Sequence, residues 1–225
     1  MGASAFLYCS CNRICWGLGK PLSEQPGAAL TRYAGNPDEP VFSQCRSASS
    51  ALWKLLADHG GHRLRVAHDW DPELHRQMET GCLPAMLDGD GEDDISFSAY
   101  LAGWPEGGFA DLLSAGFDAS DEGFLRCAEC SERLSLGRVL RDRAGAPLLF
   151  HAGAVDGVPN SRQPDLNRAA WRFLAVHFTH PMRVVTTAVG EAGEYAEQDL
   201  GGDATVGGTG PGAVPITAYV ADFSG

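Results

Sequence analysis

The chain repeats itself at a spacing of 118 residues, and this repetition constrains the possible folds more than any other feature of the sequence. Residues 6–66 match residues 124–184 without a gap, with identical amino acids at 21 of the 61 positions. After one inserted residue the match resumes at a spacing of 119, where Tyr100 corresponds to Tyr219. A repeat of this length indicates one structural unit used twice. We therefore expect two copies of one fold within the 225 residues.

The repeat divides the chain into two units, each about 100 residues long and so of ordinary domain size. The first unit is expected at 1–104 and the second at 123–225. Between them, residues 105–122 contain five acidic and no basic side chains, which is typical of a solvated linker. Because gene duplication often fuses the subunits of a symmetric dimer, we expect a monomer whose two units are related by a pseudo-two-fold axis.

Short apolar runs bounded by turn residues predict four strands in each unit. Apolar residues at helical spacing, such as Leu52 and Leu56 in the first unit, predict one main helix before the last of these strands. Ser47 and Asp165 are good N-cap residues and are expected to start the two helices. Strands on both sides of one helix indicate an α+β fold, with a small antiparallel sheet and one main helix in each unit. The expected strands are Ala5–Cys9, Ile14–Leu18, Ala28–Tyr33 and Arg63–His68, then Gly123–Cys127, Leu134–Leu136, Pro147–His151 and Met182–Val189.

Paired cysteines and histidines predict a metal site in the second unit. Cys127-x-x-Cys130 is expected at a hairpin turn, and His177-x-x-His180 at the C-terminal end of the helix. Two thiolates and two imidazoles form a complete tetrahedral ligand set for zinc. Because four protein ligands leave no position for water, such a site is expected to be structural rather than catalytic.

The first unit repeats three of these four positions, with Cys9, His59 and His62. The position that matches Cys130 holds an asparagine. Cys11 lies one residue before that asparagine and Cys15 three residues after it, and either thiol can supply the missing ligand. We therefore expect a second, less regular zinc site in the first unit.

Each of these residues also has an interpretation without a metal. A histidine at a helix C-terminus is stabilised by the helix dipole, and cysteines often pack as small apolar residues. Cys127 and His177 could also form a nucleophile and base pair. Disulfides are disfavoured, because the seven cysteines are an odd number and no export signal is visible, so reduced thiols or metal ligands are expected.

The net charge of -12 limits the partners that we expect. An acidic surface repels phosphates, which disfavours nucleic acid, and it suits either a basic protein partner or solubility alone. No apolar run is long enough to cross a bilayer, and the N-terminus lacks the basic and apolar regions of a signal peptide. We expect a cytoplasmic protein. Its abundance of arginine, alanine and glycine is typical of a GC-rich bacterial genome.

The sequence contains no recognisable catalytic motif, and it favours a non-enzymatic binding or adaptor protein with structural zinc. An acidic inhibitor or immunity-type partner of a basic protein is one form of this hypothesis. The alternative is a small hydrolase or transferase that works at a cleft between the units. In that case a metal ion or Cys127 would be the reactive element.

Overall fold

A computed structural model gives the fold, and it describes most of the chain. Asn12, Cys82 and most of the strand expected at Ala28–Tyr33 lie outside the described residues. The described residues are 4–11, 14–21, 33–34, 44–79, 85–87, 94–105, 109–114, 118–142, 144–153, 158–187, 204–208 and 212–223.

The protein is a mixed α/β structure with a mostly antiparallel sheet and few helices. The order of strands in the sheet is β10-β7-β6-β9-β4-β1-β2-β3, with β5 paired in parallel to β2 and β8 paired to β7. The strand β10 also pairs in parallel, with β7. The strands are β1 (Ala5–Cys9), β2 (Ile14–Pro21), β3 (Tyr33–Ala34), β4 (Arg63–His68), β5 (Ala85–Leu87), β6 (Asp118–Cys127), β7 (Glu132–Arg141), β8 (Pro147–His151), β9 (Met182–Thr186) and β10 (Ala204–Val206).

Two helices of 13 residues each, α1 and α5, cover much of the core. Each presents an apolar stripe, with Leu52 and Leu56 fully buried in α1 and Phe173 and Leu174 fully buried in α5. These residues recur at helical spacing, so burial against the sheet stabilises the helices. The helices are α1 (Arg46–Asp58), α2 (Pro72–Glu79), α3 (Phe97–Tyr100), α4 (Phe109–Ser114), α5 (Pro164–Val176) and α6 (Ile216–Tyr219), with a 3-10 turn at Asn160–Arg162.

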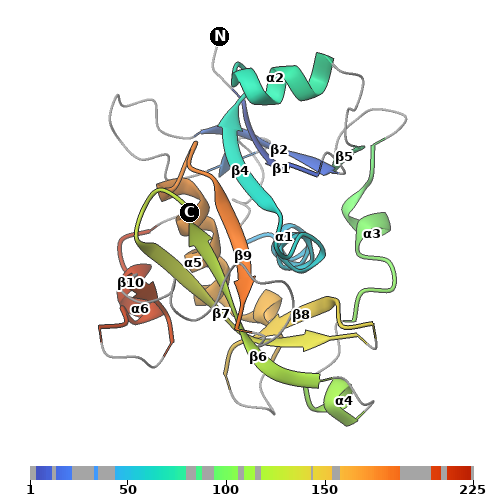
Figure 1. Cartoon of the computed structure of the whole chain (residues 1–225), viewed down its shortest axis with the longest axis vertical. Coiled ribbons are helices and arrows are strands. Elements are labelled where there is room, and N and C mark those ends of the chain that lie inside the picture. The colour runs from blue at the N-terminus through green and yellow to red at the C-terminus, as the bar shows by residue number, and fades with distance from the viewer. Residues whose placement is uncertain are drawn as a thin grey trace.

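The strands β4 and β9 join the N-terminal and C-terminal halves of the sheet. They run through the middle of the molecule, with α2 at one end and α4 at the other (Figure 1). The two strands are antiparallel, and Leu64 lies opposite Met182. These two residues hold the same position in the two copies of the repeat, so a residue of one copy pairs with its own counterpart in the other. Both side chains are fully buried.

Two backbone hydrogen bonds flank this pairing, and each crosses between the halves. The N–H of Gly61 donates to the carbonyl of Val184 at 2.9 Å, and the N–H of Thr179 donates to the carbonyl of Val66 at 2.7 Å. Gly61 and Thr179 correspond in the repeat, as do Val66 and Val184, so the two bonds are reciprocal. Both donors adopt a left-handed backbone, with φ of 78° and 67°. The turn that follows each main helix is thus attached to a strand of the other half.

The largest hydrophobic core extends through both halves of the chain. Trp16 of β2 packs edge-on against Trp171 of α5, with 5.3 Å between the ring centroids. The indole N–H of Trp53 in α1 donates to the side-chain oxygen of Asn167 in α5 at 2.8 Å. Because these contacts join residues more than 110 positions apart in the sequence, the two halves pack against each other directly.

The main helices begin earlier than the sequence predicts. Cys45 and Gln163 hold the N-cap positions, and neither side chain makes a capping hydrogen bond to its helix. Ser47 and Asp165 therefore lie inside the first turn, and the prediction that they start the helices is wrong. Pro164 is the first helical residue of α5, where its fixed φ suits a helix start. An acidic residue such as Asp165 is also favourable within the first turn.

The strand β6 begins at Asp118, five residues before the predicted start and inside the stretch expected as a linker. Its acidic residues face basic residues of β7. Glu122 lies opposite Arg138, and the carboxylate of Asp121 is 2.9 Å from the guanidinium of Arg141. The negative charge of this stretch therefore pairs with the neighbouring strand instead of remaining in solvent.

Several short elements were not expected from the sequence, namely α2 and the three-residue strands β5 and β10. The strand β9 ends at Thr186, earlier than the predicted Val189. Among the described residues, no helix combines the length and apolar character needed to cross a membrane.

Candidate metal centres

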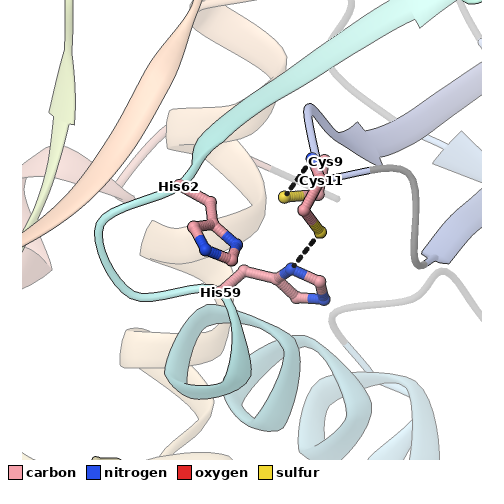
Figure 2. A group of neighbouring side chains, drawn as sticks. All are labelled: Cys9, Cys11, His59 and His62. Atoms are coloured by element: carbon pink, nitrogen blue, oxygen red, sulfur yellow. Dashed lines mark hydrogen bonds between the residues drawn. The ribbon is translucent and has the colours of Figure 1, made fainter.

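Two groups of cysteine and histidine side chains come together, one in each half of the chain. The first group comprises Cys9, Cys11, His59 and His62, and its candidate ligand atoms all lie within 4.8 Å of one another. Cys9 ends β1 and Cys11 lies in the turn that follows, while His59 is the C-cap of α1 and His62 immediately precedes β4. Figure 2 shows the hairpin and the helix end presenting these side chains to one another. All four residues were predicted as ligands.

The spacing of the first group suits a tetrahedral ion. The Sγ of Cys11 lies 3.3 Å from the Nδ1 of His59. In a tetrahedral zinc site, bonds of about 2.3 Å to sulfur and 2.0 Å to nitrogen place these two ligand atoms about 3.5 Å apart. The side chains therefore already lie near the separation that a shared zinc ion requires.

The structure resolves which thiol accompanies Cys9. Cys15 lies in a separate apolar cluster with Tyr8, Ala67 and Leu74, and burial raises the pKa of its thiol to about 12. In the pairing of β1 with β2, Cys15 lies opposite Tyr8, and side chains alternate between the faces of a strand. Cys15 therefore points to a different cluster from that of Cys9, and Cys11 is the available ligand.

The second group comprises Cys127, Cys130 and His180, whose candidate ligand atoms also lie within 4.8 Å of one another. Cys127 ends β6, Cys130 lies in the turn before β7, and His180 lies in the turn between α5 and β9. The Nδ1 of His180 is 3.6 Å from the Sγ of Cys127 and 3.3 Å from the Sγ of Cys130. Both separations are close to the tetrahedral value of about 3.5 Å.

His177, the fourth ligand predicted for the second unit, is not a member of this group. Its Nδ1 lies 2.9 Å from the carbonyl oxygen of Phe173, one turn back in the same helix. Its Nε2 lies 3.1 Å from a carboxylate oxygen of Glu132. Burial lowers the pKa of His177.

Backbone N–H groups support one sulfur in each group. The N–H of Cys11 donates to the Sγ of Cys9 at 3.5 Å, and the N–H of Cys130 donates to the Sγ of Cys127 at 3.3 Å. Hydrogen bonds of this kind stabilise a thiolate and orient it toward a metal ion. They make Cys9 and Cys127 the sulfurs best prepared to bind a cation.

The second group has an acidic outer environment that the first group lacks at the matching position. The Nε2 of His180 lies 3.5 Å from a carboxylate oxygen of Glu129, so this histidine directs one nitrogen to the thiols and the other to an acid. That arrangement is typical of metal-binding histidines. Loss of hydration, the Cys127 thiol and the charges of Glu132 and Glu129 together raise the pKa of Cys130 to about 11. A bound cation would offset this charge and favour the thiolate.

Glu129 and Glu132 were not expected in the site from the sequence. Glu129 stands between Cys127 and Cys130, and at the matching position the first unit has Cys11. An acid within a metal-binding loop is a recognisable signal for an outer ligand. Glu132 opens β7, and only the fold brings it beside His177.

Of the remaining cysteines, Cys45 lies outside both groups, with its sulfur 3.2 Å from the hydroxyl of Ser47. A comparison of the chain with protein-family models, with curated proteins and with solved structures finds no match.

Proposed function

We propose that this protein binds two zinc ions as structural centres and acts as a non-enzymatic binding protein. The observation that carries the proposal is a close contact between a thiol and an imidazole in each half, made by different positions of the repeat. In each group a cysteine sulfur lies 3.3 Å from the Nδ1 of a histidine that was distant in the sequence, Cys11 with His59 and Cys130 with His180. Thiolate and imidazole together favour zinc over cations that prefer oxygen ligands, such as Mg²⁺ and Ca²⁺.

The position of the centres supports a structural role. In each half, the cysteines come from the hairpin turn and the histidines from the turn after the main helix. Zinc would therefore fasten the hairpin to the end of the helix, beside the pairing of β1 with β4 in one half and of β6 with β9 in the other. The ligands must be deprotonated thiols and neutral imidazoles, so zinc affinity is expected to fall as the pH falls. Reduced thiols also fit a cytoplasmic protein.

The proposal includes a duplicated architecture with two units, 1–104 and 123–225, and a pseudo-two-fold axis. Three observations support it. Leu64 pairs with Met182, its own counterpart in the repeat, as the central pair of a two-fold arrangement would. The hydrogen bonds of Gly61 and Thr179 are reciprocal. The parallel strand β5 joins β2 as β10 joins β7.

This arrangement would place both metal centres on one face of the sheet. Cys9 lies opposite Leu64, Leu64 opposite Met182, and Met182 opposite Cys127, so these residues form one row across four strands. Directly paired residues of antiparallel strands point to the same face, and three strand spacings of about 4.8 Å separate the two cysteines by about 14 Å. One buried leucine and one buried methionine thus stand between the centres.

The binding partner that we propose is a basic protein. The net charge of -12 supports this choice, since opposite charges accelerate encounter and disfavour wrong partners. Binding to such a partner is expected to weaken steeply as salt is added. A pull-down from lysate at low salt, with identification of the captured protein, tests this part. Capture of nucleic acid alone would contradict it.

A second candidate function is a metal-dependent hydrolase or transferase. It is favoured by one observation, that the second group contains three rather than four candidate ligands among the residues that the structure describes. Catalytic zinc sites have three protein ligands and an open position. A substrate screen with zinc-loaded protein would distinguish this candidate from a binding protein.

Metal analysis of the purified protein is the primary test. We expect two zinc ions per chain by mass spectrometry under native conditions. Cys9→Ser and Cys130→Ser should each reduce the count to one, whereas the control Cys45→Ser should keep two. Protein that is purified without chelator, is folded and contains no metal would contradict the proposal.

A further inference from the structure

Within the described part of the chain, the second group has one candidate ligand fewer than the first, because two corresponding histidines point in different directions. His59 and His177 match in the repeat, and each is the C-cap of its helix. The Nδ1 of His59 faces the Sγ of Cys11 at 3.3 Å. The Nδ1 of His177 instead faces the carbonyl oxygen of Phe173 at 2.9 Å. The first histidine is oriented toward a thiol and the second toward its own helix.

Packing holds His177 in this orientation. Its ring lies against the ring of Phe173, with 4.1 Å between the centroids, and only 1% of the residue is exposed. A carbonyl oxygen only accepts hydrogen bonds, so Nδ1 carries the proton that it donates to Phe173. In the neutral ring the other nitrogen, Nε2, is then an acceptor.

That second nitrogen, the Nε2 of His177, is buried and has no hydrogen-bond donor in the part of the chain that the structure describes. It faces a carboxylate oxygen of Glu132 at 3.1 Å, which is a second acceptor. The side chain of Glu132 is 44% exposed and reaches solvent, whereas the Nε2 of His177 is buried, so in the neutral ring this nitrogen needs a small donor beside it.

Glu132 connects this pair to the second group. Its charge acts on both His177 and the Cys130 thiol, and Glu129 also acts on Cys130. His180, whose Nδ1 faces both thiols, acts electrostatically on His177, and the centroids of the two histidine rings are 6.1 Å apart. The buried Nε2 of His177 thus belongs to a ring that lies beside His180, one of the three candidate ligands of the second group.

We propose that the second centre binds zinc through Cys127, Cys130 and His180 and leaves its fourth position to a small exchangeable ligand. In the resting protein that ligand is water, which donates its protons to His177 and Glu132. This inference rests on the proposed zinc binding. The first centre, with four protein ligands, has no such position.

The surroundings also define the chemical class of ligand. A ligand of this position needs a lone pair for the metal and an N–H or O–H group for the two acceptors. The charges of Glu129 and Glu132 disfavour anions. Small neutral molecules such as imidazole therefore fit the position better than azide does.

Cobalt substitution tests the inference, because the visible absorption of Co²⁺ reports its coordination. Imidazole added to the protein with two bound cobalt ions should change the absorption of one ion and leave the other unchanged. Azide should bind more weakly, and Glu132→Gln should improve azide binding about threefold by removing one partly exposed charge. Cobalt counted after gel filtration should remain at two per chain.

Two variants provide a matched comparison. His180→Ala removes a ligand and should lose the second cobalt, whereas His177→Ala should keep two cobalt ions. If imidazole changes neither ion and His177→Ala loses the second cobalt, the centre is closed by His177 and the inference is wrong, although the proposed zinc binding stands. If the wild-type protein binds no cobalt or zinc, the proposed function itself is wrong. The imidazole titration uses the wild-type chain, so the test does not depend on the folding of a variant.

Discussion

The two metal groups occupy matching places in the sequence, yet the second cysteine of each is placed differently. In the first group the two thiols are two residues apart, at Cys9 and Cys11, and in the second they are three residues apart, at Cys127 and Cys130. Because of this difference of one residue, Glu129 holds in the second unit the position that Cys11 holds in the first. That acid lies beside His180 and adds negative charge to the surroundings. A shift of one residue in the turn thus places an acidic residue beside the second group, at a position where the first group has a cysteine.

The comparison also shows that two similar turns can differ in how they use a histidine. His59 and His177 follow the same helix pattern, and the backbone N–H of each donates to the carbonyl four residues earlier. Only the ring orientation differs, and it decides whether the group has three or four ligands.

Removal of both metal ions should have the largest effect. A ligand at a thousand times its dissociation constant stabilises a protein by about 4 kcal/mol per site. A strong chelator should therefore lower the melting temperature by about 10 °C or more for each ion in a chain of this length. Calorimetry of the protein before and after chelation checks this. An unchanged melting temperature would show that neither group contributes metal-dependent stability.

Truncation of the residues between the two centres should have the next largest effect. Leu64 and Met182 are fully buried and face each other across β4 and β9. Leu64→Ala and Met182→Ala should each destabilise the protein by about 3 kcal/mol through a cavity at the same place. Urea denaturation measures both values. Widely different values would contradict the proposed two-fold equivalence of these positions.

The two histidines at the helix ends should differ in their effect on metal affinity. His59→Ala removes a ligand and should weaken zinc binding in the first centre by more than about a hundredfold. His177→Ala removes an outer residue and should weaken the second centre by about tenfold, within the range seen for such partners. Competition with a chromophoric chelator measures both constants. Equal losses in the two variants would place His177 on the metal.

Substitution of the acid beside His180 should have a smaller effect than substitution of the ligand His59. Glu129→Gln keeps the shape of the side chain but removes the charge near the Nε2 of His180. Zinc affinity in the second centre should fall by about tenfold, since an outer carboxylate orients the ring and increases its basicity. The first centre serves as the internal control, because its affinity should not change.

The smallest expected effect concerns the backbone at the two cross-half hydrogen bonds. Thr179 adopts a left-handed conformation with φ of 67°, which is unfavourable for a β-branched residue, whereas Gly61 tolerates its φ of 78°. Thr179→Gly should stabilise the protein by up to about 1 kcal/mol, and Gly61→Ala should destabilise it by about 1 kcal/mol. Thermal denaturation of both variants checks the opposite signs. The space around Gly61 is open, so a clash would not explain a loss there.

Much of the secondary structure could be predicted from the sequence because each unit supported the interpretation of the other. Three strands agree with the prediction at both ends, namely Ala5–Cys9, Arg63–His68 and Pro147–His151. The strands β5 and β10 were not predictable, since three residues within a loop-rich segment carry too little pattern. The early start of β6 was missed because its acids are balanced by arginines that only the pairing with β7 reveals.

The candidate site could be predicted in its composition but not in its geometry. Seven of the eight residues that spacing in the sequence predicted as ligands lie in the two groups. It could not choose between Cys11 and Cys15, because that choice depends on the face of the sheet to which each points. It also could not give the orientation of His177, which is set by a carbonyl of its own helix.

The reciprocal bonds of Gly61 and Thr179 have a consequence for how the chain could be divided. Each half completes the sheet of the other, through β4 in one and β9 in the other. A protein cut between the halves would expose each of these strands at an unpaired edge of a sheet. Exposed edge strands readily pair with strands of other chains. A fragment of either half, produced alone, is therefore expected to restore the missing neighbour by pairing with a second copy of itself.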